Sequence, residues 1–373
     1  MHKKFDVAIL GSGVVGHTLA LLLAQERLRV ALVAPAPTSA GTAAVPDIRA
    51  YALNAASRAL LQSVRAWPDD PTSITPVQHM WVAEGDASVR FDAHTSGAQA
   101  LSWIVDVPAL EQRLAQALHY QPGITVLHER PPAALTVVCE GKRSTSRDAL
   151  GFTFDVRPYP HTAIAARLHC ERPHGTVARQ WFIDGAVLAL LPLGGPNGHS
   201  VALVWSVAPQ RAHDLLQLPA PALVAEVAHA CGHALGEMEL QGQAAGWPLE
   251  LSRAQHWVQP GVALAGDAAH AMHPLAGQGL NVGLADVATL AQVLHQREYW
   301  RDLGDFKLLR RYERARQADL DTMRWATDGL FGLFQHTDTR IQALRRWGLR
   351  GFDRLTPLKH WITQQAAGHT TTA

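Results

Sequence analysis

The sequence predicts an α/β protein, α+β overall, in which a parallel sheet is interrupted by a second, mostly antiparallel sheet. The chain opens with an apolar run, a glycine-rich turn and a helical pattern, all within about 30 residues. A second apolar run, followed by a glycine-rich loop and a helical pattern, covers residues 261–294. Between them, residues 77–92 and 152–207 hold segments that alternate apolar and polar side chains, as strands with one buried face do.

The N-terminal pattern has the order of a dinucleotide-binding unit. Residues 5–10 predict a strand, residues 19–25 a helix and residues 29–34 a second strand. Gly-Ser-Gly-Val-Val-Gly stands between the first strand and the helix. A GxGxxG motif alone is a weak signal, but the strand before it and the helix after it make dinucleotide binding the favoured interpretation over a plain turn.

Each glycine of this turn has an expected role. Gly11 allows the tight turn, and Gly16 permits close packing of helix on strand. Gly13 allows the approach of a pyrophosphate, and Val14 after it is a further expected contact. The second strand should end in an acid that holds a ribose, but residues 33–35 are Val-Ala-Pro, so the adenosine end must be held differently.

The second glycine-rich stretch predicts a strand at 261–265, a loop and a helix at 280–294. The acid that follows the strand could accept hydrogen bonds from sugar-like hydroxyls, and the loop glycines would let a flat ligand lie against bare backbone. Taken alone, a plain strand–loop–helix turn explains this stretch as well. The residues expected to contact a ligand here are Gly266, Asp267, Gly277, Gly279, Leu280 and Asn281.

Other segments complete the order of elements. Residues 103–118 predict a helix, 135–138 a buried strand and 305–335 a charged helix. Arg49 is a candidate phosphate or flavin contact, with an ordinary surface arginine as the alternative.

Composition narrows the class of protein. A chain of 373 residues suggests roughly two domains, and a net charge of +1 gives no nucleic-acid signal. The three cysteines lie far apart and the 20 histidines show no metal-ligand spacing, so we expect no disulfide and no metal site. The N-terminus is not a signal peptide, and no run of about 18 apolar residues is present, which favours a cytoplasmic protein.

Two glycine-rich sites about 260 residues apart require one long ligand, and FAD fits. Further motifs agree, and with them the chain resembles the FAD-dependent aromatic-ring monooxygenases of the para-hydroxybenzoate hydroxylase type. More narrowly, it is similar to the ubiquinone-biosynthesis hydroxylases over nearly its whole length. The motifs are Asp47-x-Arg-Ala-x-Ala-Leu53; Trp181-Phe182 with Leu190-Leu-Pro-Leu193 and Trp205; Tyr312-Glu-Arg-Ala-Arg316; and Asp319, Met323, Thr327-Asp328 and Phe334.

The resemblance implies a Rossmann-like, GR2-type FAD-binding domain with an inserted substrate-side sheet and a helical C-terminal region. We expect the FAD-binding domain at 1–76, 101–152 and 247–300, the substrate-side sheet at 77–100 and 153–246, and the helical region at 301–373. It also implies that NAD(P)H reduces FAD, that a C4a-hydroperoxyflavin forms with O2, and that this hydroxylates the ring of a (poly)prenylated phenol.

The resemblance also assigns residue roles. Asp267 would hold the ribityl chain, while Pro274 and the loop 277–281 would line the isoalloxazine. His273 could face the substrate, although a structural histidine is an equal alternative, and His270 is more readily structural. Glu140-Gly141, followed by Ser144 and Arg147, matches a motif that touches the flavin pyrophosphate and the nicotinamide cofactor. The family usually has Asp where Glu140 stands, so Glu140→Asp is expected to leave cofactor use unharmed or improve it.

Two other functions stay open. The chain could hydroxylate another aromatic compound, or serve as a flavin-poor accessory subunit of a quinone-biosynthesis complex. Other quinone-biosynthesis proteins are possible partners. Residues 340–355 carry five arginines and an apolar helical face with Trp347 at its edge, which suggests peripheral contact with the inner face of a membrane. The alternative is that this face packs on the FAD-binding domain.

Overall fold

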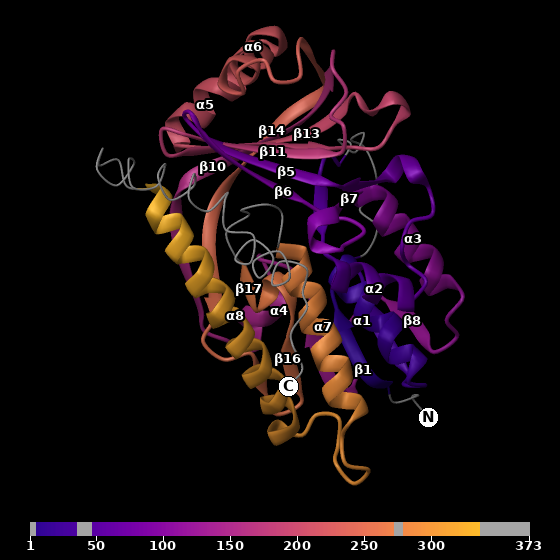
Figure 1. Ribbon diagram of the computed structural model, residues 1–373. Coiled ribbons are helices and arrows are strands. Elements are labelled where there is room, and N and C mark those ends of the chain that lie inside the picture. The colour runs from indigo at the N-terminus through magenta and orange to yellow at the C-terminus, as the bar shows by residue number, and fades with distance from the viewer. Residues whose placement is uncertain (1–4, 36–46, 272–278, 336–373) are drawn as a thin grey trace.

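The computed structural model describes residues 5–35, 47–271 and 279–335, and its strands form three sheets (Figure 1). The class is mixed α/β, as the sequence predicts. A six-stranded and an eight-stranded sheet form the two halves of the molecule, and a small three-stranded sheet accompanies them. The segments predicted as strands at 5–10, 29–34, 135–138 and 261–265 all belong to the six-stranded sheet.

The six-stranded sheet carries the first glycine turn. Its order is β15-β16-β9-β1-β2-β8, and every pairing is parallel except that of β15 with β16. Helices α1 (Val14–Gln25) and α7 (Gly279–His295) pack against each other on this sheet. The strand bounds are Phe5–Leu10 (β1), Val30–Val33 (β2), Ile124–Leu127 (β8), Ala133–Val138 (β9), Val258–Gln259 (β15) and Val262–Leu264 (β16). Because parallel strands end at one edge, the residues after β1, β2, β9 and β16 gather there.

The eight-stranded sheet has the order β17-β14-β10-β13-β12-β11-β5-β6, and only the β11–β5 pairing is parallel. This confirms the predicted, largely antiparallel second sheet. Helices α5 (Pro209–Gln217) and α6 (Ala220–Ala230) cover one face (Figure 1). The strand bounds are His79–Glu84 (β5), Ala87–Asp92 (β6), Phe154–Cys170 (β10), Val177–Ile183 (β11), Ala186–Pro192 (β12), Ser200–Val207 (β13), Met238–Ala254 (β14) and His270–Ala271 (β17).

The three-stranded sheet corrects one prediction. Residues 103–118 do not form one helix, because Ser102–Asp106 is strand β7, and helix α3 begins only at Val107 (Val107–His119). The Trp-Ile-Val run suits a strand, and β7 is hydrogen-bonded on both sides, to β3 (Ala50–Leu53) and β4 (Ile74–Val77). Pro108 then stands in the first helical turn, where its missing N–H costs nothing.

The remaining helices are α2 (Ala55–Ser63), α4 (Thr145–Ala149) and α8 (Phe306–Gln335). Helix α8 packs against α7 and β15.

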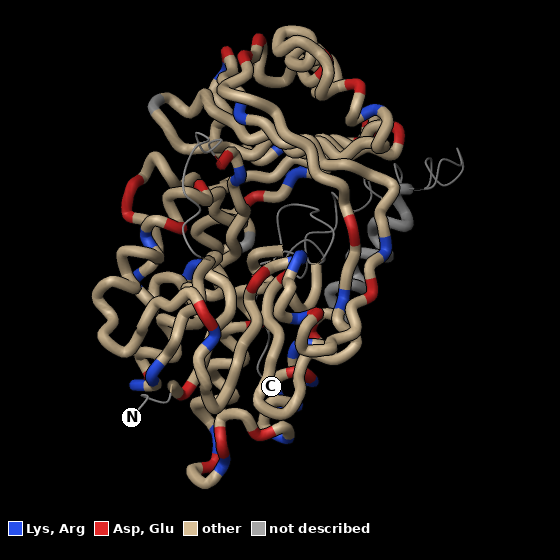
Figure 2. The backbone as a smooth tube through the Cα atoms, turned by 180° about the vertical axis from the view of Figure 1, so that it is seen from behind, with Lys and Arg blue, Asp and Glu red and all other residues tan. Residues whose placement is uncertain are grey.

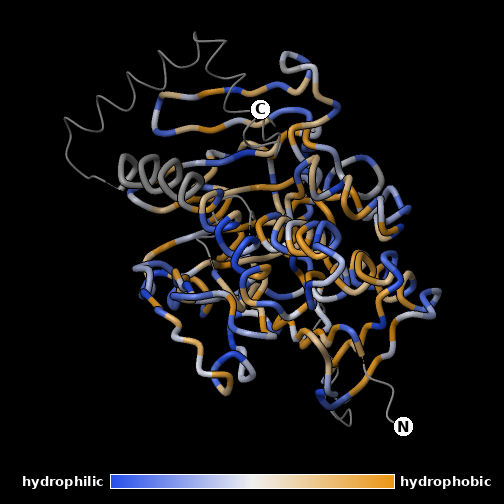
Figure 3. Tube along the Cα trace, turned by 90° about the horizontal axis from the view of Figure 1, so that it is seen from below, coloured by the Kyte–Doolittle hydropathy of each residue, from blue (hydrophilic) through white to orange (hydrophobic). Residues whose placement is uncertain are grey.

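Acidic and basic residues are interspersed along the chain, in agreement with its small net charge (Figure 2). Within the described ranges, no helix is long and apolar enough to cross a membrane. Hydrophobic and hydrophilic stretches are interspersed along the chain (Figure 3). The three cysteines are buried and form no disulfide. The domain division stays a prediction; β14 runs through its boundary at residue 247.

Candidate cofactor site

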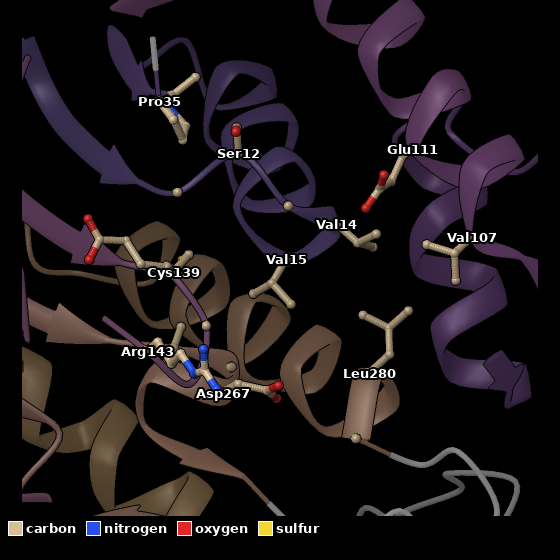
Figure 4. Close-up of a pocket in the computed structure, with 18 of the residues that line it drawn as sticks. Ser12, Val14, Val15, Pro35, Val107, Glu111, Cys139, Arg143, Asp267 and Leu280 are labelled. Carbon is tan, nitrogen blue, oxygen red and sulfur yellow. The ribbon is translucent and has the colours of Figure 1, made fainter. Parts of the chain in front are cut away.

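A cavity of about 770 Å³ lies at the edge where β1, β2, β9 and β16 end (Figure 4). This volume is within the range of sites that bind cofactors and other small molecules. The cavity brings together both glycine motifs, which are distant in sequence. The predicted contact residues that line it are Gly11, Gly13, Val14, Arg49, Glu140, Gly141, Gly266, Asp267, Gly279 and Leu280.

The first glycine turn combines close packing with open space. Gly11 has a φ of 112°, and a Cβ there would lie 2.5 Å from the carbonyl oxygen of Cys139. A Cβ on Gly16 would lie 2.0 Å from the carbonyl oxygen of Gly11, so Gly16 serves helix packing and does not line the cavity. A Cβ on Gly13 would meet nothing within 4 Å. No side chain caps the N-terminus of α1 at Gly13, so its N–H groups are available to an anion in the cavity.

Asp267 stands at the end of β16 and faces the cavity. Its carboxylate has no hydrogen-bond partner among the described residues, and Figure 4 shows it on the side opposite Ser12. Burial by the surrounding protein raises the pKa of Asp267, although His270 acts in the opposite direction. An acceptor held in this way can take hydrogen bonds from ligand hydroxyls.

Asp286 fixes the loop that carries Asp267. Its carboxylate is fully buried and accepts hydrogen bonds from the Gly266 N–H (2.9 Å), His270 Nε2 (2.6 Å) and Arg316 Nε (2.8 Å). His270 is therefore engaged in structure, as favoured from the sequence. Sequence analysis missed Asp286, although a lone acid among the apolar residues of 280–294 was an available signal.

Side chains of helix α8 hold the segment that leads into this loop. Tyr312 donates its hydroxyl to the carbonyl oxygen of Leu264 at 2.8 Å, and Glu313 accepts the N–H of Trp257 at 2.7 Å. Arg316 also pairs with Asp319 at 2.7 Å. The α8 motif thus holds the end of β16 without lining the cavity.

Glu140 has a local structural role that its family match did not indicate. Its carboxylate accepts hydrogen bonds from the Ser144 hydroxyl (2.7 Å), the Ser146 hydroxyl (2.7 Å) and the Ser146 N–H (3.1 Å). Ser144 in turn caps α4 by accepting the N–H of Arg147. The buried Arg147 guanidinium lies 3.5 Å from the ring centre of Phe154 and donates to the Ala268 carbonyl oxygen. The 140–147 turn is therefore tied to the Asp267 loop.

Asn281 was predicted as a ligand contact, but its side chain is occupied. It donates to the Ala52 carbonyl oxygen at 2.8 Å and accepts from the Asn54 N–H (3.0 Å) and the Ser57 hydroxyl (2.7 Å). It does not line the cavity, so any ligand contact would have to come from its backbone. The candidates His273, Pro274 and Gly277 lie outside the described residues.

The cavity also contains residues that sequence analysis did not select. Glu111 of α3 points into it, and burial raises the pKa of this carboxyl against the effect of Arg49 (Figure 4). Arg49 itself forms an ion pair with Asp47 at 2.5 Å. Ser12, Tyr51, His128 and Arg143 also line the cavity.

The motif residues of the eight-stranded sheet could either roof an apolar pocket or belong to the core. Trp181, Leu190 and Trp205 are buried in a cluster with Leu215 of α5 and Val227 of α6. These three residues are core under the helices and do not form a pocket roof. Successive side chains of a strand point to opposite faces, and the other face carries mainly small and aliphatic residues, among them Ala178, Ala189, Leu191 and Ala202.

Comparisons with known proteins decide the family. Residues 128–323 match the family model described as "FAD binding domain". The chain is 31% identical to ubiquinone hydroxylase UbiL of Rhodospirillum rubrum, over 98% of this chain and 90% of that protein. It is equally 31% identical to the 3-demethoxyubiquinol 3-hydroxylase of Escherichia coli, over 98% of this chain and 99% of that protein. The chain belongs to the FAD-binding monooxygenase family that includes the ubiquinone hydroxylases.

The fold agrees with this family. The crystal structure of p-nitrophenol 4-monooxygenase PnpA from Pseudomonas putida superposes with a TM-score of 0.78 and 18% identity, covering 100% of both chains. The protein is an FAD-dependent monooxygenase, and its cavity fits the cofactor: it offers an uncapped helix N-terminus, open space at Gly13 and an unpaired acceptor at Asp267.

Proposed function

We propose that this protein hydroxylates the aromatic ring of a (poly)prenylated phenol in ubiquinone biosynthesis, with NAD(P)H and O2 as co-substrates. The observation that carries the proposal is the 31% identity with two ubiquinone hydroxylases across 98% of the chain. Similarity that extends through both sheets and into α8 covers the cofactor-binding half and the substrate-side half alike.

The cavity residues have complementary roles toward FAD in this proposal. The N–H groups of the α1 N-terminus, beside Gly13 and Val14, bind the pyrophosphate. Asp267 accepts hydrogen bonds from the ribityl hydroxyls, and the start of α7 at Gly279 and Leu280 presents backbone N–H groups to the ring system. Gly141 and Arg49 line the remaining wall. The assignments of His273, Pro274 and Gly277 to the ring pocket stay predictions.

The protein's part in the reaction is to position the reactants and exclude water. Bound FAD would supply the redox chemistry that couples oxidation of NAD(P)H to the transfer of one oxygen atom from O2 to the ring. Ala178, Ala189 and Leu191 on the other face of the eight-stranded sheet are buried against Val77 and Ile104, and this core holds the substrate-side half in place.

The test combines a visible spectrum with product analysis. Purified protein reconstituted with FAD should show flavin absorbance and consume NAD(P)H faster when a prenylated phenol is added. Mass spectrometry should find one added oxygen atom in that phenol and none in soluble phenols such as p-nitrophenol. The reverse preference would make the protein a monooxygenase of another aromatic compound. A colourless protein in excess FAD would favour the accessory-subunit alternative.

Residues 340–355, which lie outside the described residues, provide the proposed contact with the inner face of a membrane. Support comes from the sequence alone: five arginines beside an apolar face suit anionic headgroups, and a prenylated substrate resides in lipid. The protein and a chain ending at Asp338 should be compared by flotation with anionic liposomes, after both are shown to hold FAD. Wild type should float and the shortened chain should not. Equal flotation would exclude the tail and favour delivery of the substrate by other quinone-biosynthesis proteins.

A further inference from the structure

The adenosine end of the cavity lacks the acid that usually holds a ribose. Strand β2 ends at Val33, and no Asp or Glu occurs between Glu26 and Asp47 in the sequence. In dinucleotide-binding folds an acid near this position accepts a hydrogen bond from the ribose 2′-hydroxyl. A cofactor with the same adenosine group therefore needs another acceptor at this edge of the sheet.

The strand register brings one histidine to this position. Strand β8 is the parallel neighbour of β2, with Leu127 paired to Val33, and the Ala34 N–H donates to the Leu127 carbonyl oxygen at 2.9 Å. His128 follows at once, and its Nδ1 lies 3.3 Å from the carbonyl oxygen of Ala34. His128 lines the cavity together with Val33, Ala34 and Pro35, none of which has a polar side-chain atom.

The contact with Ala34 also settles which ring nitrogen carries the proton. A carbonyl oxygen can only accept, so Nδ1 of His128 must donate. In the neutral imidazole, Nε2 is then a hydrogen-bond acceptor, which is what a carboxylate would supply. We propose that His128 binds the ribose 2′-hydroxyl of the adenosine group of FAD and replaces the missing acid at the end of β2. The proposal depends on FAD as the cofactor, but not on which ring is hydroxylated.

Ser12 is the alternative candidate for the contact with the ribose 2′-hydroxyl. Figure 4 shows it on the same side of the cavity as Pro35, and its hydroxyl could also contact a ribose. Ser12 belongs to the glycine turn after β1, however, whereas His128 directly follows β8, the strand next to β2. The two residues make different predictions for ligands that differ only in the 2′-hydroxyl.

The experiment measures how well ADP and 2′-deoxy-ADP displace FAD from the full-length protein, with flavin fluorescence as the readout. Wild type should bind 2′-deoxy-ADP about fivefold more weakly than ADP, the effect of one hydrogen bond. In His128→Ala the two affinities should be equal, because ADP binding falls about fivefold and 2′-deoxy-ADP binding does not change. His128→Gln keeps a side chain that can reach the hydroxyl and should retain a preference for ADP.

Two control variants separate this role from its alternatives. Glu129→Gln should keep the wild-type ratio of the two affinities, because Glu129 does not line the cavity. Ser12 does line it, so Ser12→Ala tests the alternative directly: the ratio should stay at its wild-type value when His128 makes the contact and should fall to one when Ser12 does. The His128 side chain is exposed, so its replacement should leave the unfolding temperature unchanged. Equal wild-type affinities for the two nucleotides, or a preference that survives in His128→Ala, would overturn the proposal. Failure of wild type to bind FAD at all would instead contradict the cofactor assignment.

Discussion

The sharpest structural prediction concerns Asp286→Asn, which keeps the shape of the side chain and removes its charge. The wild-type carboxylate accepts from Gly266, His270 and Arg316, whereas an amide oxygen keeps only part of that capacity and its NH2 group meets donors. Removing one partner of a buried ion pair costs about 3–5 kcal/mol. Arg316 keeps Asp319 as a second partner, so we expect the free energy of unfolding to fall by about 3 kcal/mol, which lowers the folding equilibrium constant roughly 150-fold.

The control for this variant is Asp319→Asn. Both carboxylates pair with Arg316, but the Asp319 side chain is 54% exposed and that of Asp286 is 0% exposed. An exposed pair contributes at most about 1 kcal/mol. Urea unfolding followed by tryptophan fluorescence measures both variants, and FAD titration should show weaker binding only for Asp286→Asn, because the Gly266 N–H loses its anchor. Equal urea midpoints for Asp286→Asn and wild type, or equal losses of unfolding free energy in Asp286→Asn and Asp319→Asn, would refute this account of the loop.

The pH dependence gives a second check on the same residue. Burial alone would raise the pKa of Asp286, but His270 and Arg316 outweigh it and hold the pKa below the ordinary 3.8. A carboxyl with a lowered folded-state pKa contributes stability above pH 3.8, and this contribution is lost as the pH falls further. The difference in stability between wild type and Asp286→Asn should therefore shrink as the pH falls below about 4.

Three further predictions test the cavity itself. Gly13→Val should abolish FAD binding without a loss of stability, because its side chain extends into the open space of the cavity. Gly16→Ala should destabilise the fold, because its Cβ would meet the Gly11 carbonyl oxygen. FAD titration and thermal unfolding distinguish the two variants. Glu140→Asp should cost about 1 kcal/mol in thermal unfolding, since the shorter acid cannot keep all three serine hydrogen bonds, and adding Ser146→Ala should recover part of it. Asp267→Asn should bind FAD about tenfold more weakly, because the amide replaces one acceptor oxygen with a donor group; unchanged FAD affinity in this variant would contradict the role of the carboxylate.

Local patterns predicted the parts of the fold that depend on local spacing. The strand at 5–10 and the helix that ends at residue 25 followed from apolar runs, and the structure confirms both, although α1 begins at Val14 and not at residue 19. The helix prediction for residues 103–106 was wrong, because their conformation is set by β3 and β4, which pair with them from distant parts of the chain. The spacing of Trp, Ile and Val fits the start of a helix as well as a short strand, so only the pairing could decide.

The missed cavity residues share the same cause. His128 reaches the site only because β8 is the neighbour of β2, and no local feature of the sequence states that strand order. Glu111 lies on an ordinary amphipathic helix, where an acid is expected to face solvent. Glu140 is a different case, because it was predicted and its partners Ser144 and Ser146 are close in sequence; only the turn that leads into α4 brings their hydroxyls to its carboxylate.

The C-terminal motif shows how residues outside a cavity can be specific to one family of enzymes. Tyr312 and Arg316 lie on one face of α8, four residues apart. Tyr312 donates a hydrogen bond to the Leu264 carbonyl oxygen. Arg316 acts indirectly, because it binds the Asp286 carboxylate that accepts the Gly266 N–H. Asp267, which carries an unpaired acceptor toward the cavity, comes directly after these anchored residues. The neighbours Ala265, Gly266 and Ala268 are buried, and the hydrogen bonds to Leu264 and Gly266 anchor them, so α8 and α7 determine the position of this carboxylate. The sequence of the C-terminal helix is therefore constrained by the cofactor site, although its side chains do not reach it.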